Sequence, residues 1–88
     1  MGFYVYALQD VTGKRVYIGQ CGSLEKRLEA HNAGYVKSTR SDRPWTLVAF
    51  QIVEERKEAR WIEHELKKSR GKRSRWLQNH AVTLGIHQ

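Results

Sequence analysis

Two short runs of residues typical of β-strands lie so close together in this chain that only a short turn can connect them. Residues 3–8 read FYVYAL and residues 16–19 read VYIG, and both runs are rich in aromatic and β-branched side chains. Between them, Thr12-Gly13 is typical of a turn. A parallel pair would need a crossover of about a dozen residues or more, so this spacing predicts an antiparallel hairpin.

A third strand and three helices are predicted in the rest of the chain. Residues 45–53 (WTLVAFQIV) are apolar and partly β-branched, which favours a strand. Ser23 is a good N-cap for a helix over residues 24–32, and residues 54–69 open with acids and close with bases, as a longer helix prefers. We expect Gly71 to end that longer helix. The apolar side chains of a last short helix, which Gly85 would stop, are Trp76, Leu77, Ala81 and Leu84.

The third predicted strand carries apolar residues on both of its faces. Successive side chains of a strand point to opposite sides of a sheet. This alternation predicts Leu47, Ala49 and Gln51 on one face, and Val48, Phe50 and Ile52 on the other.

Length and composition predict a single small cytoplasmic domain over residues 1–88. A chain of 88 residues with 40% hydrophobic and 28% charged residues is typical of a globular domain with a thin core. The single cysteine, Cys21, excludes an internal disulfide framework and fits a reducing compartment. No apolar stretch approaches the ~20 residues that a membrane-spanning helix needs, so we expect no membrane partner.

The charge of the chain favours a polyanion as partner. Sixteen Lys and Arg against nine Asp and Glu give a net charge of +7. From residue 67 to residue 75, six of nine residues are basic and none is acidic. A solvated basic helix end is the alternative interpretation of this run. Its basic members are Lys67, Lys68, Arg70, Lys72, Arg73 and Arg75.

Glu63 stands out because it falls within the apolar stripe of the longest predicted helix. It follows Ala59 by four residues and precedes Leu66 by three, so the three share one helical face. Carboxylates avoid buried positions unless they are paired or bind a cation. Two interpretations stay open: an ion pair with Lys67 one turn later, or a Mg²⁺ ligand.

Arg27 and His31 lie four residues apart on one face of the first predicted helix. Together they would offer a bidentate clamp for a phosphate and a proton acceptor. Taken singly, Arg27 could pair with acidic neighbours on its helix, and His31 could bond the carbonyls at the helix end. On the hairpin, Tyr6 can face Tyr17 across the strands, where aromatic packing is the alternative to a catalytic role.

Five blocks in order resemble the GIY-YIG nuclease domain in its small stand-alone form. They are YVYAL, VYIG, LEKRLEAHN, TR…RPW and EARWIEHELKK, and they cover roughly residues 3–68, which leaves residues 67–88 as a basic C-terminal segment. The resemblance implies an α+β fold, with a small three-stranded antiparallel sheet flanked by helices. It also implies cleavage of phosphodiester bonds in nucleic acid with one divalent cation, Mg²⁺ or Mn²⁺.

Carried over residue by residue, the resemblance assigns a site. Catalytic roles fall to Tyr6, Tyr17, Arg27, His31 and Glu63, with Glu63 as the metal ligand. We expect Tyr6 to accept a proton from the attacking water once a nearby cation lowers its pKa, although the two tyrosines are interchangeable in this role. The residues expected to contact nucleic acid are Gly19, Thr39, Arg40, Lys67, Lys68, Arg70, Lys72, Arg73 and Arg75.

The sequence departs from the family pattern at two places. The first motif reads Tyr4-Val5-Tyr6 rather than Gly-Ile-Tyr, but the final tyrosine is kept. Arg75 stands where some members have a late asparagine. We also see no second DNA-recognition domain, so we expect little sequence specificity unless a recruiting protein or a homodimer supplies it.

The expected function is a divalent-metal-dependent endonuclease. The substrate would be DNA, in single-stranded, branched or damaged form, with RNA kept as a second candidate. A catalytically inactive nucleic-acid-binding module of the same fold is the first alternative. A zinc or other histidine-based enzyme is the second, although no pair among its candidate ligands has the short spacing of a structural zinc site. These candidate ligands are Cys21, His31, His64 and His80.

Overall fold

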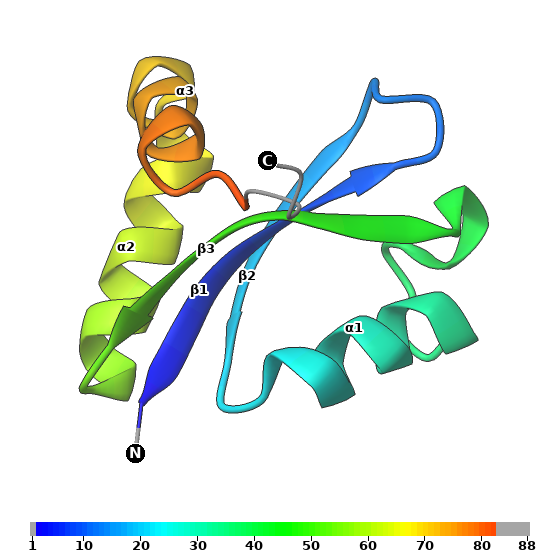
Figure 1. Cartoon of the computed structure of the whole chain (residues 1–88), viewed down its shortest axis with the longest axis horizontal. Helices are drawn as coiled ribbons and strands as arrows, with labels where there is room; N and C mark the ends of the chain where they lie inside the picture. Colours follow the sequence, from blue (N-terminus) through cyan, green and yellow to red (C-terminus); the bar gives the residue numbers. More distant parts are fainter. Residues whose placement is uncertain (1, 83–88) are drawn as a thin grey trace.

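The computed structural model describes residues 2–82 and has an α+β fold, as predicted. Three antiparallel strands, β1 (Phe3–Asp10), β2 (Val16–Cys21) and β3 (Trp45–Val53), form a sheet in the order β2-β1-β3. Helix α1 (Leu24–Ala33) covers one face of this sheet (Figure 1). Helices α2 (Arg56–Lys68) and α3 (Arg70–Asn79) cover the other face. A short 3₁₀-helix, η1 (Arg40–Asp42), lies between α1 and β3.

The predicted hairpin forms β1 and β2. Gly13 takes a positive φ of 77° in the turn, a conformation that favours glycine. Asp10, at the end of β1, closes the turn by accepting hydrogen bonds from the Thr12 hydroxyl at 2.8 Å and from the Arg15 amide at 3.0 Å. The turn therefore has a defined shape rather than that of a loose loop.

The sheet separates two apolar clusters. Against α2 and α3 lies a cluster that includes Val5, Ala49, Leu66 and Trp76. The face toward α1 has a cluster of buried side chains built on Tyr6, Leu8, Cys21 and Trp45. Polar His31 and Thr39 are fully buried beside it. Most of the buried polar chemistry is thus on the α1 face.

A β-bulge overturns the alternation predicted for β3. Ala7 pairs with Ala49, but Leu8 pairs with Leu47, so Val48 is an extra residue on β3. Leu47 therefore packs in the cluster on the α1 face, whereas Val48 and Ala49 both pack in the cluster on the α2 face. The prediction that Leu47 and Ala49 share a face was wrong, because a bulge shifts the period of two.

The two C-terminal helices meet at Ser69 rather than at Gly71. Ser69 has an extended backbone, and its hydroxyl accepts a hydrogen bond from the Lys72 amide at 3.2 Å, as an N-cap does. Gly71 therefore lies inside α3, and the expectation that it ends the longer helix was wrong.

The chain after α3 returns to the sheet. Ala81 forms an isolated antiparallel bridge with Ala49, so its predicted helical position was wrong. The amide of Val82 donates to the Val48 carbonyl at 2.9 Å, next to the bulge. Backbone pairing with β3 replaces a further helical turn here. Leu84 and Gly85, which complete the predicted last helix, lie outside the described residues.

Membrane insertion finds no support among the helices. Within residues 2–82, none combines the length and the apolar character that crossing a bilayer would require.

Candidate active site

Tyr6 lies at the centre of the site, on the middle strand of the sheet. Its side chain is 1% exposed, and it faces Gly19 across the pair of β1 and β2. A Cβ atom at position 19 would lie 2.6 Å from the Tyr6 hydroxyl, so glycine alone leaves room for the ring. The close approach expected at Gly19 is therefore an approach to the Tyr6 phenol.

A chain of hydrogen bonds joins α1 to this phenol. Arg27 Nε donates to the Tyr6 hydroxyl at 3.2 Å, and the same hydroxyl lies 2.9 Å from His31 Nε2. His31 Nδ1 lies 2.8 Å from the Thr39 hydroxyl, which is 3.4 Å from the Val36 carbonyl. One proton order satisfies all of these groups: Tyr6 donates to Nε2, Nδ1 donates to Thr39, and Thr39 donates to the Val36 carbonyl.

Burial keeps both rings of this chain neutral. It lowers the pKa of His31 to about 4, and the positive charge of Arg27 adds to that shift. Burial also raises the pKa of Tyr6 well above its ordinary value, and the hydrogen bond from Arg27 offsets only part of the rise. Arg27 thus lowers the Tyr6 pKa, as expected of a nearby cation, but by less than the desolvation of a phenolate raises it. Tyr6 therefore keeps its proton.

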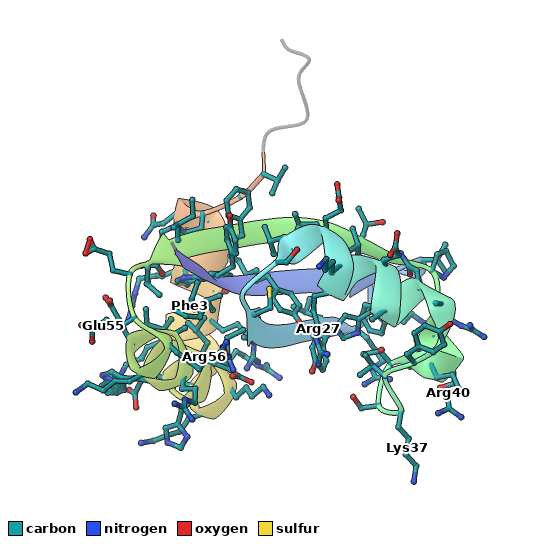
Figure 2. The ribbon with its side chains drawn as sticks, turned by 90° about the horizontal axis from the view of Figure 1, so that it is seen from below. Phe3, Arg27, Lys37, Arg40, Glu55 and Arg56 are labelled. Atoms are coloured by element: carbon teal, nitrogen blue, oxygen red, sulfur yellow. The ribbon has the colours of Figure 1, made fainter. Side chains whose placement is uncertain are left out.

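Tyr17 is the phenol nearest the outer edge of the sheet. It is partly buried on the edge strand β2, with its ring 4.8 Å from that of His31 and 6.4 Å from that of Trp45. Arg27 extends from α1 toward β2 (Figure 2). Its hydrogen bond to Tyr6, together with a contact to Tyr17, raises the pKa of the guanidinium, which therefore stays charged between the two phenols.

Glu63 lies on the face of α2 that runs along the edge of β2. Arg56, Glu63 and Lys67 fall on one stripe of this helix. Arg56 Nη1 donates to the Gln20 side chain at 3.5 Å, and Lys67 Nζ lies 5.7 Å from the centre of the Tyr17 ring. Glu63 lies between these two residues along α2, and its partner Lys67 reaches the Tyr17 ring at the edge of the sheet.

The carboxylate of Glu63 has a single partner among residues 2–82. Its side chain is 21% exposed, and its Oε2 accepts a hydrogen bond from Lys67 Nζ at 2.8 Å. The ion pair considered from the spacing is therefore present, and Oε1 remains for a cation. Within residues 2–82, no three His, Cys, Asp or Glu side chains gather to hold a metal. A single carboxylate fits Mg²⁺, which commonly takes its other oxygens from substrate phosphate and water.

Two of the candidate ligands of the zinc alternative, His31 and His80, have other contacts. His31 is held between Tyr6 and Thr39. The ring of His80 packs 5.2 Å from that of Trp76, next to the end of α3. These contacts leave neither histidine directed toward the other.

Two of the residues expected to contact nucleic acid come from the segment between α1 and β3. Thr39 is fully buried beside His31, where it cannot contact a nucleic acid and instead positions the histidine. Arg40 is exposed, and its Nε donates to the Gly34 carbonyl at 3.0 Å. It lies at the opposite end of the molecule from Arg56 (Figure 2).

The basic run of residues 67–75 does not form one continuous face. Lys68 and Lys72 both pair with Glu65, at 3.7 and 2.6 Å, and these contacts lower the pKa of that carboxyl. The other basic members are exposed or partly buried on α2 and α3: Lys67, Arg70, Arg73 and Arg75.

Sequence reasoning missed two residues that shape the site. Asn32 accepts a hydrogen bond from the Trp45 amide at 2.6 Å and donates to the Trp45 carbonyl at 3.0 Å, which fixes the end of α1 against β3. Lys14, in the hairpin turn, lines a cleft with Tyr17. The turn prediction could have indicated Lys14, since it lies three residues before Tyr17. Nothing local indicated the partner of Asn32.

Three comparisons relate this sequence and fold to known proteins. The sequence matches the GIY-YIG catalytic domain over residues 2–78. A UPF0213 protein of Clostridium perfringens is 41% identical over 66 residues, which are 74% of this chain and 70% of the relative. A UPF0213 protein of Syntrophus aciditrophicus is 42% identical over 53 residues, which are 58% of this chain and 60% of the relative.

A solved structure shares the fold. It is the solution NMR structure of a UPF0213 protein from Bacillus halodurans, with a TM-score of 0.55 and 32% sequence identity. The match covers 89% of this chain and 84% of the other. Because the family model spans residues 2–78 and this solved relative shares the fold, the chain belongs to the GIY-YIG catalytic domain family.

Proposed function

We propose that this protein is a divalent-metal-dependent endonuclease that hydrolyses phosphodiester bonds in DNA, with little sequence specificity of its own. One observation carries the proposal. The charged guanidinium of Arg27 contacts both Tyr6 and Tyr17. Lys67, which bonds the Glu63 carboxylate, also lies near the Tyr17 ring. Packing alone does not require Arg27 and Glu63 to flank the same strand. A phosphate at this edge would meet both charges.

Glu63 would hold the ion, Mg²⁺ or Mn²⁺, with one ion per site. When bound there, the ion supplies neutralisation of the phosphate charge and stabilisation of the leaving oxygen. Lys67 now bonds the same carboxylate, so it would have to yield one oxygen or share it. Its long side chain on the exposed end of α2 allows this movement.

Arg27 would stabilise the negative charge that develops on the phosphate oxygens during cleavage. The hydrogen bond from its Nε to Tyr6 fixes the guanidinium, and neutral His31 in turn fixes the Tyr6 hydroxyl. We therefore assign Tyr6 and His31 to positioning Arg27, because a buried phenol that keeps its proton is a poor acceptor. Tyr17, at the edge of the sheet, is the phenol placed to orient the attacking water.

A cleavage assay tests this function. End-labelled single-stranded, duplex and branched DNA of one sequence, and the matching RNA, are incubated with the protein in Mg²⁺, Mn²⁺ or EDTA. We expect cleavage that needs a divalent ion and that falls by about 10³-fold in Glu63→Gln, since the loss of a metal ligand removes several kcal/mol of stabilisation. Glu58→Gln, an exposed carboxylate on the same helix, is the matched control and should cleave as wild type does.

The inactive binding module is the second candidate, and the Glu63–Lys67 ion pair favours it. This pair neutralises the carboxylate without any metal. The module predicts that nucleic acid binds equally well in EDTA and that no product forms at any metal concentration. Binding of the nucleic acids without cleavage of any of the four in either Mg²⁺ or Mn²⁺ would replace the endonuclease proposal with this one.

A further inference from the structure

A cleft of about 410 Å³ opens along the edge of β2, next to the proposed catalytic groups. Its walls come from the β1–β2 turn, from β2 and from the facing parts of α2 and α3. A volume of this size is in the range of small-molecule sites and is enough for a nucleotide portion of a strand. The residues that line it are Lys14, Val16, Tyr17, Ile18, Lys67 and Arg73.

Three of these six residues are cations, and none is an acid. Each cation comes from a different element: Lys14 from the turn, Lys67 from α2 and Arg73 from α3. Lys67 already bonds Glu63, but no acid lines the cleft, so the positive charges of Lys14 and Arg73 favour an anion there. The remaining wall, with Val16 and Ile18, is apolar and would suit a sugar rather than a second charge.

The backbone of Lys14 and the side chains of Arg73 and Lys67 have defined contacts. Lys14 follows the fixed turn, and its amide donates to the Thr12 hydroxyl at 3.2 Å. Arg73 Nη1 donates to the Leu66 carbonyl at 3.1 Å, which fixes the guanidinium while its other amino groups remain for a ligand. Lys67 is shared, because its ammonium bonds Glu63 and also lines the cleft.

Tyr17 connects the cleft to the catalytic groups. Tyr17 is one of the residues that line the cleft, and its side chain also contacts Arg27. Gly19, beside the Tyr6 phenol, and Val16, in the cleft, are three residues apart on an extended strand, or about 10 Å. A nucleic-acid strand with its scissile phosphate at Arg27 and Glu63 would therefore bring a flanking phosphate to the cleft.

We propose that this cleft is a subsite for a non-scissile phosphate of the substrate strand, held by Lys14, Lys67 and Arg73. The proposal rests on the proposed nuclease function. The nucleic-acid strand would then follow the edge of β2, from Arg27 past Tyr17 to the hairpin turn. The subsite would contact a phosphate and no base, so it would position the nucleic-acid strand without adding sequence specificity.

Binding measured without cleavage tests the subsite. Fluorescence anisotropy of a labelled 12-nucleotide oligothymidine in EDTA compares wild type with Lys14→Ala and Arg73→Gln. We expect each variant to bind about tenfold more weakly, with a salt dependence reduced by about 0.7 per lost phosphate contact. Lys57→Ala, which removes an exposed lysine near the start of α2, is the control and should bind within twofold of wild type. Thermal melts confirm that Arg73→Gln is folded.

A second series asks whether one particular phosphate occupies the cleft. Each phosphate near the mapped cleavage point is replaced in turn by a neutral methylphosphonate. We expect one flanking replacement to weaken wild type about tenfold and to have no further effect on Lys14→Ala, since the pair forms one contact.

The outcomes separate the two proposals. The subsite would be overturned, while wild type still cleaves, if every methylphosphonate weakened binding by the same factor in Lys14→Ala as in wild type. Equal affinity and equal salt dependence in all variants would overturn it too. If wild type neither binds nor cleaves any of the nucleic acids, the proposed function itself fails, and the subsite fails with it.

Discussion

The two faces of the sheet that flank the proposed site differ in how complete their polar contacts are. On the α1 face, hydrogen bonds join the partly buried Arg27 to a chain of three buried side chains, Tyr6, His31 and Thr39. On the α2 face, the carboxylate of Glu63 keeps one oxygen without a partner among residues 2–82, and three cations surround a cleft. The first arrangement is preorganised, whereas the second would be completed by the proposed cation and phosphate.

This difference suggests a division of work between the faces. Preorganised groups lose little entropy when a transition state forms, so a fixed guanidinium is well suited to stabilise charge. Groups that await a cation and an anion can bind and release them in each turnover. The following variants test whether the α1 face is preorganised and the α2 face binds ligands, in order of decreasing expected effect.

Among the variants below, the largest effect is expected at Arg27, the partly buried end of the hydrogen-bonded chain. Arg27→Ala should lower the cleavage rate by about 10²–10³-fold, because it removes the charge aimed at the phosphate. Stability should fall by little, since the arginine is only partly buried. Single-turnover cleavage and thermal melts measure the two quantities. A rate within threefold of wild type would remove Arg27 from the catalytic role.

A pH titration tests whether the α1 face is built around a neutral histidine. The pKa of His31 is about 4 in the folded protein and 6.5 in a free histidine, so the unfolded chain binds the extra proton first as pH falls. Stability should therefore be full above pH 6.5 and decline toward pH 4, by up to about 3 kcal/mol. Urea melts between pH 4 and pH 7.5 measure this decline. In His31→Gln the decline should be smaller, and an equal decline in both proteins would contradict the assignment.

Gly19 tests how tightly the middle of the site is packed. In Gly19→Ala the new Cβ atom would lie 2.6 Å from the Tyr6 hydroxyl, and the buried ring cannot move aside freely. We expect a loss of about 1–3 kcal/mol in stability, as is usual for overpacking. Chemical denaturation measures the loss. Gly22→Ala is the matched control, because a Cβ atom there would have no neighbour within 4 Å. Equal stability of the two variants would show that the ring has room.

The smallest effect is expected at Lys67, on the incomplete face. Lys67→Met removes the cation that bonds Glu63 while it keeps the length of the side chain. The affinity of the protein for Mn²⁺, measured by titration calorimetry without nucleic acid, should rise by up to about fivefold, in line with a partly exposed ion pair worth at most about 1 kcal/mol. Glu63→Gln should abolish this gain. A weaker affinity in Lys67→Met would indicate that the lysine does not compete for the carboxylate.

Much of the fold could be predicted because its causes are local. The gap between the first two strands admits a hairpin, Ser23 caps α1 as expected, with its hydroxyl 3.4 Å from the Lys26 amide, and the charges of α2 follow the helix dipole. The errors arise where a distant segment intervenes. Val48 forms a bulge that shifts the register of β3 against β1, and Ala81 pairs with Ala49 of β3 instead of extending a helix.

The sequence by itself determined the residue types of the proposed site and their order along the chain, because family motifs and helical spacing are properties of neighbouring residues. Only the tertiary structure decided their states and neighbours. Tyr6 keeps its proton and His31 stays neutral because the folded core removes water from both rings. Lys14 meets Lys67 and Arg73 because the hairpin, α2 and α3 converge at one edge of the sheet. Burial and convergence both depend on segments far apart in the chain, and local sequence patterns do not contain them.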